Sequence, residues 1–327
     1  MSSYHPDRDS CARARNAHSA NRSRHLAVLL ATIAAVSLFF HPDRARSTGV
    51  TADSHGSASL NTVTIQAAKA RKELERRVDH YVVSNVVTYL HDSLVRWNTP
   101  VCPLAAGLQK DMGEFILGRI SQVARAAHVP LAGEHCAANL YVIATPYPDQ
   151  LLQKWRERNP RMYSLCNGWG GVQTFLHSRR PVRVWYNTKF TAPDGHAVPL
   201  DTLQVPYFSP FQGCVGGGGL GTRIRYSAVQ SLSSVFVIVD LSQTKNMTIG
   251  QLADYVSLLG LAQIDVEGDP GQAPTILNLF RASQQPPQAL SSWDQALLYS
   301  LYNTNQSSVL EVSMIERSIV SQVTSGE

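Results

Sequence analysis

The sequence predicts an α/β fold with a helical C-terminal portion, and three patterns support this prediction. First, a β-branched run over 94–101 is followed by an amphipathic helix over 106–127 and then by the apolar run 139–145. This order is typical of a βαβ unit. Second, Ser234–Asp240 is the most hydrophobic predicted strand, and a long helix over 249–262 follows it. Third, the chain ends in further predicted helices, over 291–303 and 308–323.

The other elements complete a single α/β domain that is expected to span residues 62–327. In chain order they are a helix over 64–82, a strand over 82–90, a helix over 148–158, a strand over 182–190 and a short apolar segment over 275–280. The turn Pro193-Asp194-Gly195 should carry the strand before it into a hairpin.

Residues 1–47 are expected to be a leader, either a cleaved signal peptide or an uncleaved N-terminal anchor. The run Leu26–Phe40 is uncharged and mostly apolar, follows an arginine-rich start, and is shorter than the roughly 20 residues that span a bilayer. Small and polar residues over 48–61 then predict a linker. The protein is therefore expected to be periplasmic or secreted, and to touch a membrane only through an uncleaved N-terminus.

The net charge depends on this leader. The whole chain has 29 Lys and Arg against 24 Asp and Glu. Seven Arg and three Asp lie within residues 1–47, so 22 basic and 21 acidic residues remain after its removal. A nearly neutral chain lacks the basic surface that would attract the phosphates of a nucleic acid. No nucleic-acid partner is therefore expected.

Four cysteines remain beyond the leader, and they allow three pairings. None has the C-x-x-C spacing of a redox or zinc motif. In an oxidising compartment two structural disulfides are expected, and Cys102–Cys136 and Cys166–Cys214 are favoured because sequence neighbours usually become neighbours in space. Four buried free thiols are the alternative.

The glycine run Gly216–Gly221 contains the spacing G-x-G-x-x-G. The phosphate-binding form of this motif needs a strand before it and a helix after it, whereas here the β-type run Thr222–Tyr226 follows. The run is therefore expected to be a loop, and no cofactor is expected. The chain also lacks a G-x-S-x-G nucleophile motif.

The predicted helix over 249–262 has the frame of a zinc-peptidase helix without its ligands. It begins with a capping box, Thr248 and Gln251. Ala253 occupies the position of the first zinc ligand, Asp254 that of the catalytic acid, and Ser257 that of the second zinc ligand. Alanine donates nothing to zinc, and the last histidine of the chain is His196, so no metal is expected. Leu259 of this helix and Phe236 are expected to be buried where the helix meets the Ser234–Asp240 strand.

Several short motifs resemble an uncharacterised family of exported bacterial proteins with a zincin-like layout. They include Arg96-Trp97-x-x-Pro100-Val101, Ala138–Val142, the Leu259-Gly260-Leu261 helix end, Thr275–Phe280 and Trp293-Asp294-x-x-Leu297-Leu298. The resemblance covers roughly residues 94–305. It implies a twisted mixed sheet with one long helix beside it and a second below, and it implies no activity because the metal-binding positions differ.

The candidate binding residues are Asn167, Trp169 and Gly217. They belong to the loops 165–172 and 213–221, which Cys166–Cys214 would join, and an exposed Trp in a glycine-rich loop is a good contact residue. We therefore expect a non-catalytic exported binding or assembly module, whose partner would be another envelope protein or a cell-wall component. The alternative is a divergent cell-envelope hydrolase or peptidase that uses Asp254. A purely structural envelope protein is the third possibility.

Overall fold

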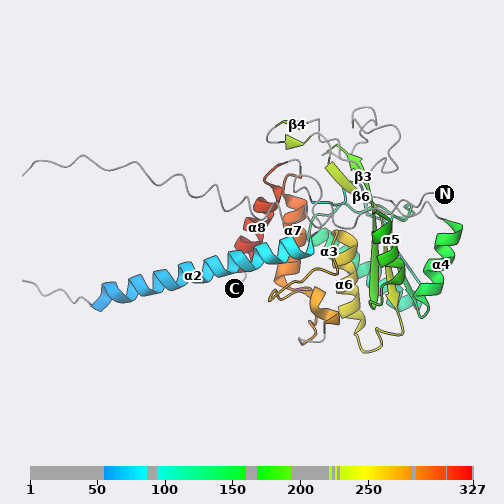
Figure 1. Ribbon diagram of the computed structural model, residues 1–327, viewed down its shortest axis with the longest axis horizontal. Coiled ribbons are helices and arrows are strands. Elements are labelled where there is room, and N and C mark those ends of the chain that lie inside the picture. Colours follow the sequence, from blue (N-terminus) through cyan, green and yellow to red (C-terminus); the bar gives the residue numbers. More distant parts are fainter. Residues whose placement is uncertain are drawn as a thin grey trace, which may run out of the picture. The chain divides into compact units, whose positions relative to one another are not determined.

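The computed structural model describes residues 55–86, 94–159, 168–192, 221–222, 225–226, 229–281, 285–306 and 308–325 (Figure 1). The chain divides into two compact units, Met1–Gly56 and Ser57–Glu327, and the fold below is that of the second unit. The expected leader, residues 48–54 of the expected linker, the turn at 193–195, and Cys166 and Cys214 lie outside the described residues. Residues 55–61 were also expected to be linker, but they are helical and begin the helix that was expected from residue 64.

A four-stranded mixed sheet forms the centre of this unit. Its strand order is β1 (Pro103–Ala106), β2 (Leu140–Thr145), β6 (Val229–Asp240) and β3 (Val182–Thr191). Strands β1, β2 and β6 are parallel, and β3 runs antiparallel to β6 at the edge. The helix α3 (Lys110–Ala126) connects β1 to β2, which makes the expected βαβ unit. The fold is therefore α/β, as the sequence predicts.

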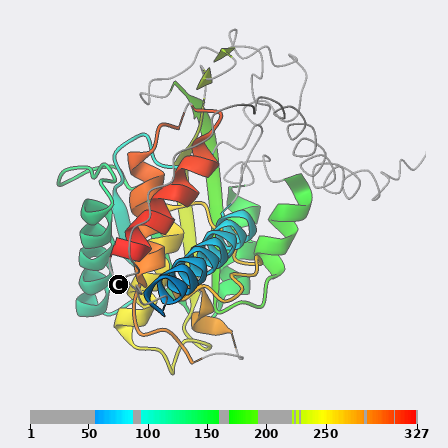
Figure 2. The same ribbon diagram turned by 90° about the vertical axis from the view of Figure 1, so that its left-hand side faces the viewer.

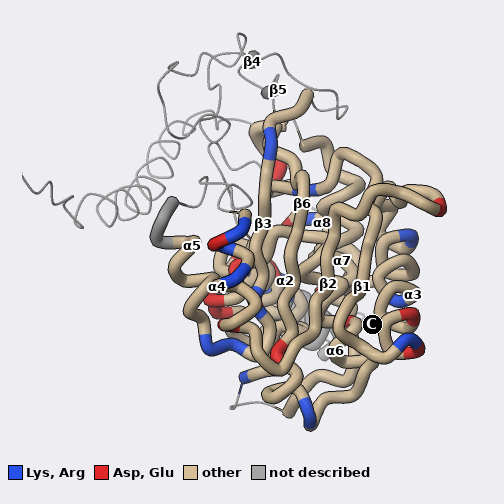
Figure 3. Tube along the Cα trace, turned by 90° about the vertical axis from the view of Figure 1, so that its right-hand side faces the viewer, with Lys and Arg blue, Asp and Glu red and all other residues tan. Residues whose placement is uncertain are grey.

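Helices cover both faces of the sheet. On one face lie α3 and α6 (Ile249–Leu261), with the α7–α8 pair beyond them (Figure 2). On the other face, α4 and α5 lie over β3 and β6 (Figure 3). The bounds of the remaining elements are α2 (His55–Asn85), α4 (Pro148–Arg158), α5 (Gly168–His177), β4 (Gly221–Thr222), β5 (Arg225–Tyr226), the 3-10 helix η5 (Ile276–Phe280), α7 (Ser292–Asn303) and α8 (Glu311–Ser325).

The central strand β6 divides its side chains between two hydrophobic clusters. Val235 and Val237 lie in the large core that also holds α3, α6, α7 and α8. Phe236, its neighbour, lies in the smaller cluster with Leu152 of α4 and Phe175 of α5. Alternation along a strand produces this separation.

This division corrects one expectation about the core. Leu259 is fully buried in the large core, as expected. Phe236 is also buried, but it packs on the opposite face of the sheet and does not meet α6. The expected contact between the two residues is wrong because only the odd-numbered residues of this part of β6 point towards α6.

Two strands were expected near the N-terminus of the domain, over 82–90 and 94–101; the second and the described part of the first are wrong, and residues 87–90 lie outside the described residues. Residues 82–85 continue α2, because Val78, Tyr81 and Val82 bury one side of that helix at helical spacing. Residues 94–101 form isolated bridges and no strand; among the bridges are Arg96 to Ser231 and Val101 to Leu131.

The first strand of the βαβ unit therefore comes later than expected, at β1. The turn from β1 into α3 contains Gly107, whose φ is +78°. A Cβ there would lie 1.9 Å from the carbonyl oxygen of Ala144, so only glycine fits. Because the turn occupies this position, α3 begins at Lys110 and not at residue 106.

The disulfide Cys102–Cys136 is present, with its Cα atoms 6.0 Å apart. Under denaturing, non-reducing conditions we expect neither of its cysteines to react with an alkylating agent, and one disulfide-linked peptide pair to contain both. Mass spectrometry of a tryptic digest measures this. Alkylation of the two cysteines before reduction would contradict the bond, and the same digest tests the expected Cys166–Cys214 pair.

Candidate binding groove

Helix α6 buries the residues of the zinc-peptidase frame. Its whole stretch from Gln251 to Leu261 is buried, because the helix packs under the sheet with α3 on one side. Ala253 and Ser257 are fully buried, and the Ser257 hydroxyl donates to the carbonyl oxygen of Ala253 at 2.7 Å. The expected capping box is present: Thr248 Oγ1 accepts from the Gln251 amide at 3.1 Å.

Asp254, the acid of this frame, uses both carboxylate oxygens to hold other elements. Its Oδ1 accepts from Nε of Arg119 on α3, and its Oδ2 accepts from the backbone N–H of Leu290 at 2.9 Å. The Asp254 side chain is 4% exposed and that of Arg119 is 27% exposed. A buried charge needs a partner of this kind, and the ion pair connects α3, α6 and the segment that leads into α7.

The structure does not assemble a metal site from the described ranges. Within them, no three His, Cys, Asp or Glu side chains lie close enough together to hold one ion. His196 lies outside the described residues. Among the described helices, none combines the length and apolarity that a bilayer crossing requires.

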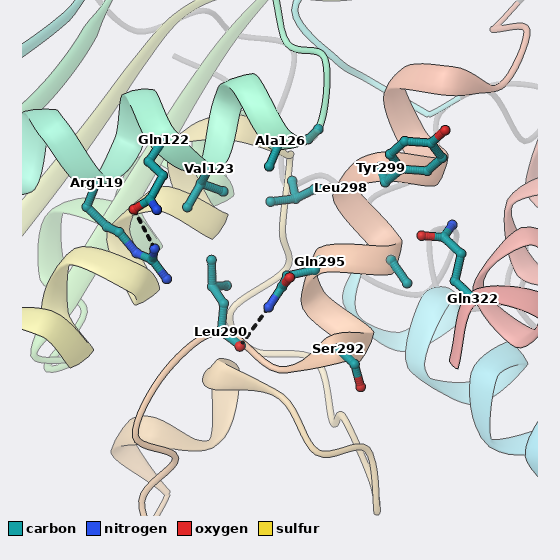
Figure 4. A pocket seen from close by; sticks show the side chains of 12 residues that line it. Arg119, Gln122, Val123, Ala126, Leu290, Ser292, Gln295, Leu298, Tyr299 and Gln322 are labelled. Atoms are coloured by element: carbon teal, nitrogen blue, oxygen red, sulfur yellow. Dashed lines mark hydrogen bonds between the residues drawn. The ribbon is translucent and has the colours of Figure 1, made fainter. Parts of the chain in front are cut away.

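Two adjoining hollows open beside the Arg119–Asp254 pair, and both are lined by Arg119 and Gln122 of α3. We refer to them together as the Arg119 groove. The first has a volume of about 420 Å³ and lies between α3 and α7, with one residue from α8 (Figure 4). The second has a volume of about 460 Å³ and lies between α3 and the start of α6. Hollows of this size suit small ligands.

Polar side chains in the first hollow are partly held by internal hydrogen bonds. Gln122 Oε1 accepts from Nη1 of Arg119 at 2.7 Å, and Gln295 Nε2 donates to the carbonyl oxygen of Leu290 at 3.2 Å (Figure 4). Gln322 Nε2 of α8 donates to two serine hydroxyls, at 3.0 and 3.1 Å. These bonds fix the amides in place at the wall of the groove.

The binding residues expected from the sequence lie elsewhere. Trp169 belongs to the first turn of α5 and not to a loop, which corrects the expectation. The helix forms despite its glycines because Val172, Phe175 and Leu176 bury one side of it at helical spacing. Asn167 and Gly217 lie outside the described residues.

The sequence contains one signal that points to the groove. Asp254 is an acid in the middle of a helix that is otherwise apolar, and such a residue predicts a cationic partner. Arg119, between Ile116 and Ile120 in the predicted amphipathic helix, carries the charge that such a partner needs. The glutamines of the groove come from three different helices, so no local pattern joins them.

Comparisons with family models, with curated proteins and with solved structures found no match to this chain. By its fold and its groove, the protein is an α/β domain with a polar, helix-walled groove beside a buried ion pair.

Proposed function

We propose that this protein is an exported, non-catalytic binding module whose ligand site is the Arg119 groove. The observation that supports this best is the state of Asp254. Both of its oxygens accept hydrogen bonds from the protein, and its side chain is almost fully buried. A general base must come within hydrogen-bond distance of the proton that it removes. Both oxygens of Asp254 instead accept hydrogen bonds from Arg119 and Leu290.

The zincin-like layout is part of the proposal. Its support is a mixed sheet with β3 antiparallel at the edge and with α3 and α6 packed on one face. At the frame position of the first ligand, the fully buried Ala253 offers no donor. A divergent hydrolase that uses Asp254 is the second candidate, and the same experiment tests it.

Gly118 of α3 allows the groove to be blocked without a change in the core. A Cβ at this exposed position would meet no atom within 4 Å, and the residue lines the second hollow. Phenylalanine at 118 should therefore fill the second hollow of the groove while the protein stays folded. Gly133 is the matched control, since it is also exposed and has open space around its Cβ but lies outside the groove.

In ligand-observed NMR with a mixed fragment library, we expect fragments to bind the wild type and the Gly133→Phe variant. We expect Gly118→Phe to lose most of this binding, because the added ring occupies the hollow. Fragments that bind all three proteins equally, and whose binding Gln295→Ala in the first hollow also leaves unchanged, would contradict the groove as the ligand site. Near-stoichiometric zinc in protein purified without added metal, lost together with peptide hydrolysis in Asp254→Asn, would support the hydrolase instead.

A further inference from the structure

We infer that the Arg119 groove takes an uncharged saccharide that carries acetamido groups. This inference rests on the proposed binding function and names the class of ligand. Four properties of the groove support it: its charge, its hydrogen-bonding groups, its apolar surface and the nature of its walls.

The groove presents no net charge from the described residues that line it. Arg119 and Asp254 are the charged side chains among them, and they form an ion pair. An ionic ligand would have to compete with this pair or lose its hydration without a counter-charge. A neutral ligand avoids both costs.

The two walls of the first hollow offer opposite hydrogen-bonding groups. On the α3 wall, the Gln122 Oε1 is used by Arg119, so its NH₂ group is left as a donor. On the other wall, the nitrogens of Gln295 and Gln322 are used, so their oxygens are left as acceptors. None of these three remaining groups bonds to another residue in the described part of the chain.

A secondary amide carries both of the groups that such walls can bond. Its C=O and N–H point in opposite directions across a planar trans bond, so one acetamido group can accept on one side and donate on the other. Arg119 adds donors to the α3 wall beyond the two N–H groups used by Asp254 and Gln122.

Apolar surface accompanies these polar groups. Tyr299 of α7 is 39% exposed and lines the same hollow with the exposed Ala126 of α3, whereas Val123 and Leu298 beneath them are buried (Figure 4). In the second hollow Phe115 is 48% exposed. The methyl of an acetyl group can pack on Ala126, and the C–H face of a sugar ring can pack on the exposed ring of Tyr299 or Phe115.

The walls of the groove disfavour a peptide. Extended peptides bind by adding to a free strand edge, whereas helices, whose backbone groups are bonded internally, form most of these walls. An amphipathic helix needs a continuous apolar groove, and here the amides of Gln122 and Gln295 interrupt the apolar surface. Both observations favour the saccharide.

The test is calorimetric titration of the purified full chain with three probes. They are a β-1,4-linked trisaccharide of N-acetylglucosamine, the β-1,4-linked trisaccharide of glucose, and N-acetyl-trialanine amide. We expect the first to bind and the second to bind at least about tenfold more weakly, because it lacks the acetamido hydrogen bonds. The third carries amides without sugar rings and is expected to bind weakly or not at all.

Two variants locate the binding. Gln122→Ala should weaken binding of the N-acetylglucosamine trisaccharide about tenfold, since it removes a donor from the α3 wall. Gln153→Ala removes an exposed glutamine from α4, on the other face of the sheet, and should leave binding unchanged. Both replacements favour the helix, so folding is not at risk.

Each other outcome overturns a stated part of the inference. Equal affinity for both trisaccharides overturns the acetamido preference, and stronger binding of the peptide overturns the saccharide class. Binding that Gln122→Ala leaves unchanged overturns the location. If no trisaccharide binds but fragments still do so in a Gly118-dependent manner, the ligand class is wrong and the binding function stands. If neither binds, the proposed function fails as well.

Discussion

Replacement of Glu311 by glutamine is expected to lower the free energy of unfolding by about 3–5 kcal/mol. Glu311 and Arg96 form an ion pair in which their side chains are 0% and 5% exposed. Glu311 Oε2 also accepts from the backbone N–H of Leu94 at 3.0 Å, and Arg96 donates to the carbonyl oxygens of Leu301 and Thr304. Glutamine keeps the shape but leaves the buried guanidinium without a counter-charge.

Urea denaturation of the purified protein measures this loss. The matched control is Glu75→Gln on α2, which breaks an ion pair with Arg71 whose side chains are 51% and 73% exposed. That change should cost less than about 1 kcal/mol. A double variant, Arg96→Met with Glu311→Leu, should recover much of the stability, because neither buried charge remains. An effect of Glu311→Gln no larger than the control would contradict the structural role of the pair.

The sequence predicted the elements in which the spacing of buried apolar residues shows directly whether the segment is a helix or a strand. The α6 capping box and the helices α3, α4, α7 and α8 follow from apolar spacing and from polar residues at helix ends. Strands β2 and β6 were visible as apolar runs because each is covered on both faces. The order of the strands depends on pairs far apart in the chain and was not visible.

The errors in the sequence prediction have local causes. Val82 is β-branched, but it continues the buried side of α2 that Val78 and Tyr81 form. Gly168–Gly171 suggested a loop, while three apolar residues after it support the helix α5. In both places burial outweighed the intrinsic preference of the residues.

The candidate site was harder to predict than the fold. Asp254 was noticed because of the zinc-peptidase frame, but its partner Arg119 is 135 residues away in the sequence. Arg96 also has a distant partner. It belongs to a motif of the family resemblance, but that motif gives no physical role for its charge. Its counter-ion, Glu311, lies on α8. Long-range pairing of charges leaves no periodic trace in a single sequence.

Asp294 is the residue with the second large expected effect. Its carboxylate is fully buried and accepts five hydrogen bonds: from Tyr81 Oη at 3.0 Å, from Thr275 Oγ1, from the backbone N–H of Ile276 at 2.8 Å, and from the N–H and hydroxyl of Ser291 at 2.9 Å each. These donors belong to α2, to the start of η5 and to the N-cap of α7. The side chain therefore joins its own helix α7 to η5, the element before it, and to α2, which is more than 200 residues away in the sequence.

Asp294→Asn is expected to cost about 3–5 kcal/mol at pH 7, because the new amide nitrogen would face N–H donors and leave them unpaired. Asp79→Asn, an exposed change on α2, is the control and should stay within about 0.5 kcal/mol of wild type.

Burial raises the pKa of Asp294 above its ordinary value of 3.8, although the hydrogen bonds oppose that rise. The native state therefore binds this proton more tightly than the unfolded chain does, and acidification favours folding at this site. The stability difference between wild type and Asp294→Asn should grow as the pH falls from 7 through the native pKa, and should level off below 3.8, the unfolded value. Urea denaturation of both proteins across this range measures the difference. A difference that shrinks on acidification would mean that the hydrogen bonds to the carboxylate outweigh its burial.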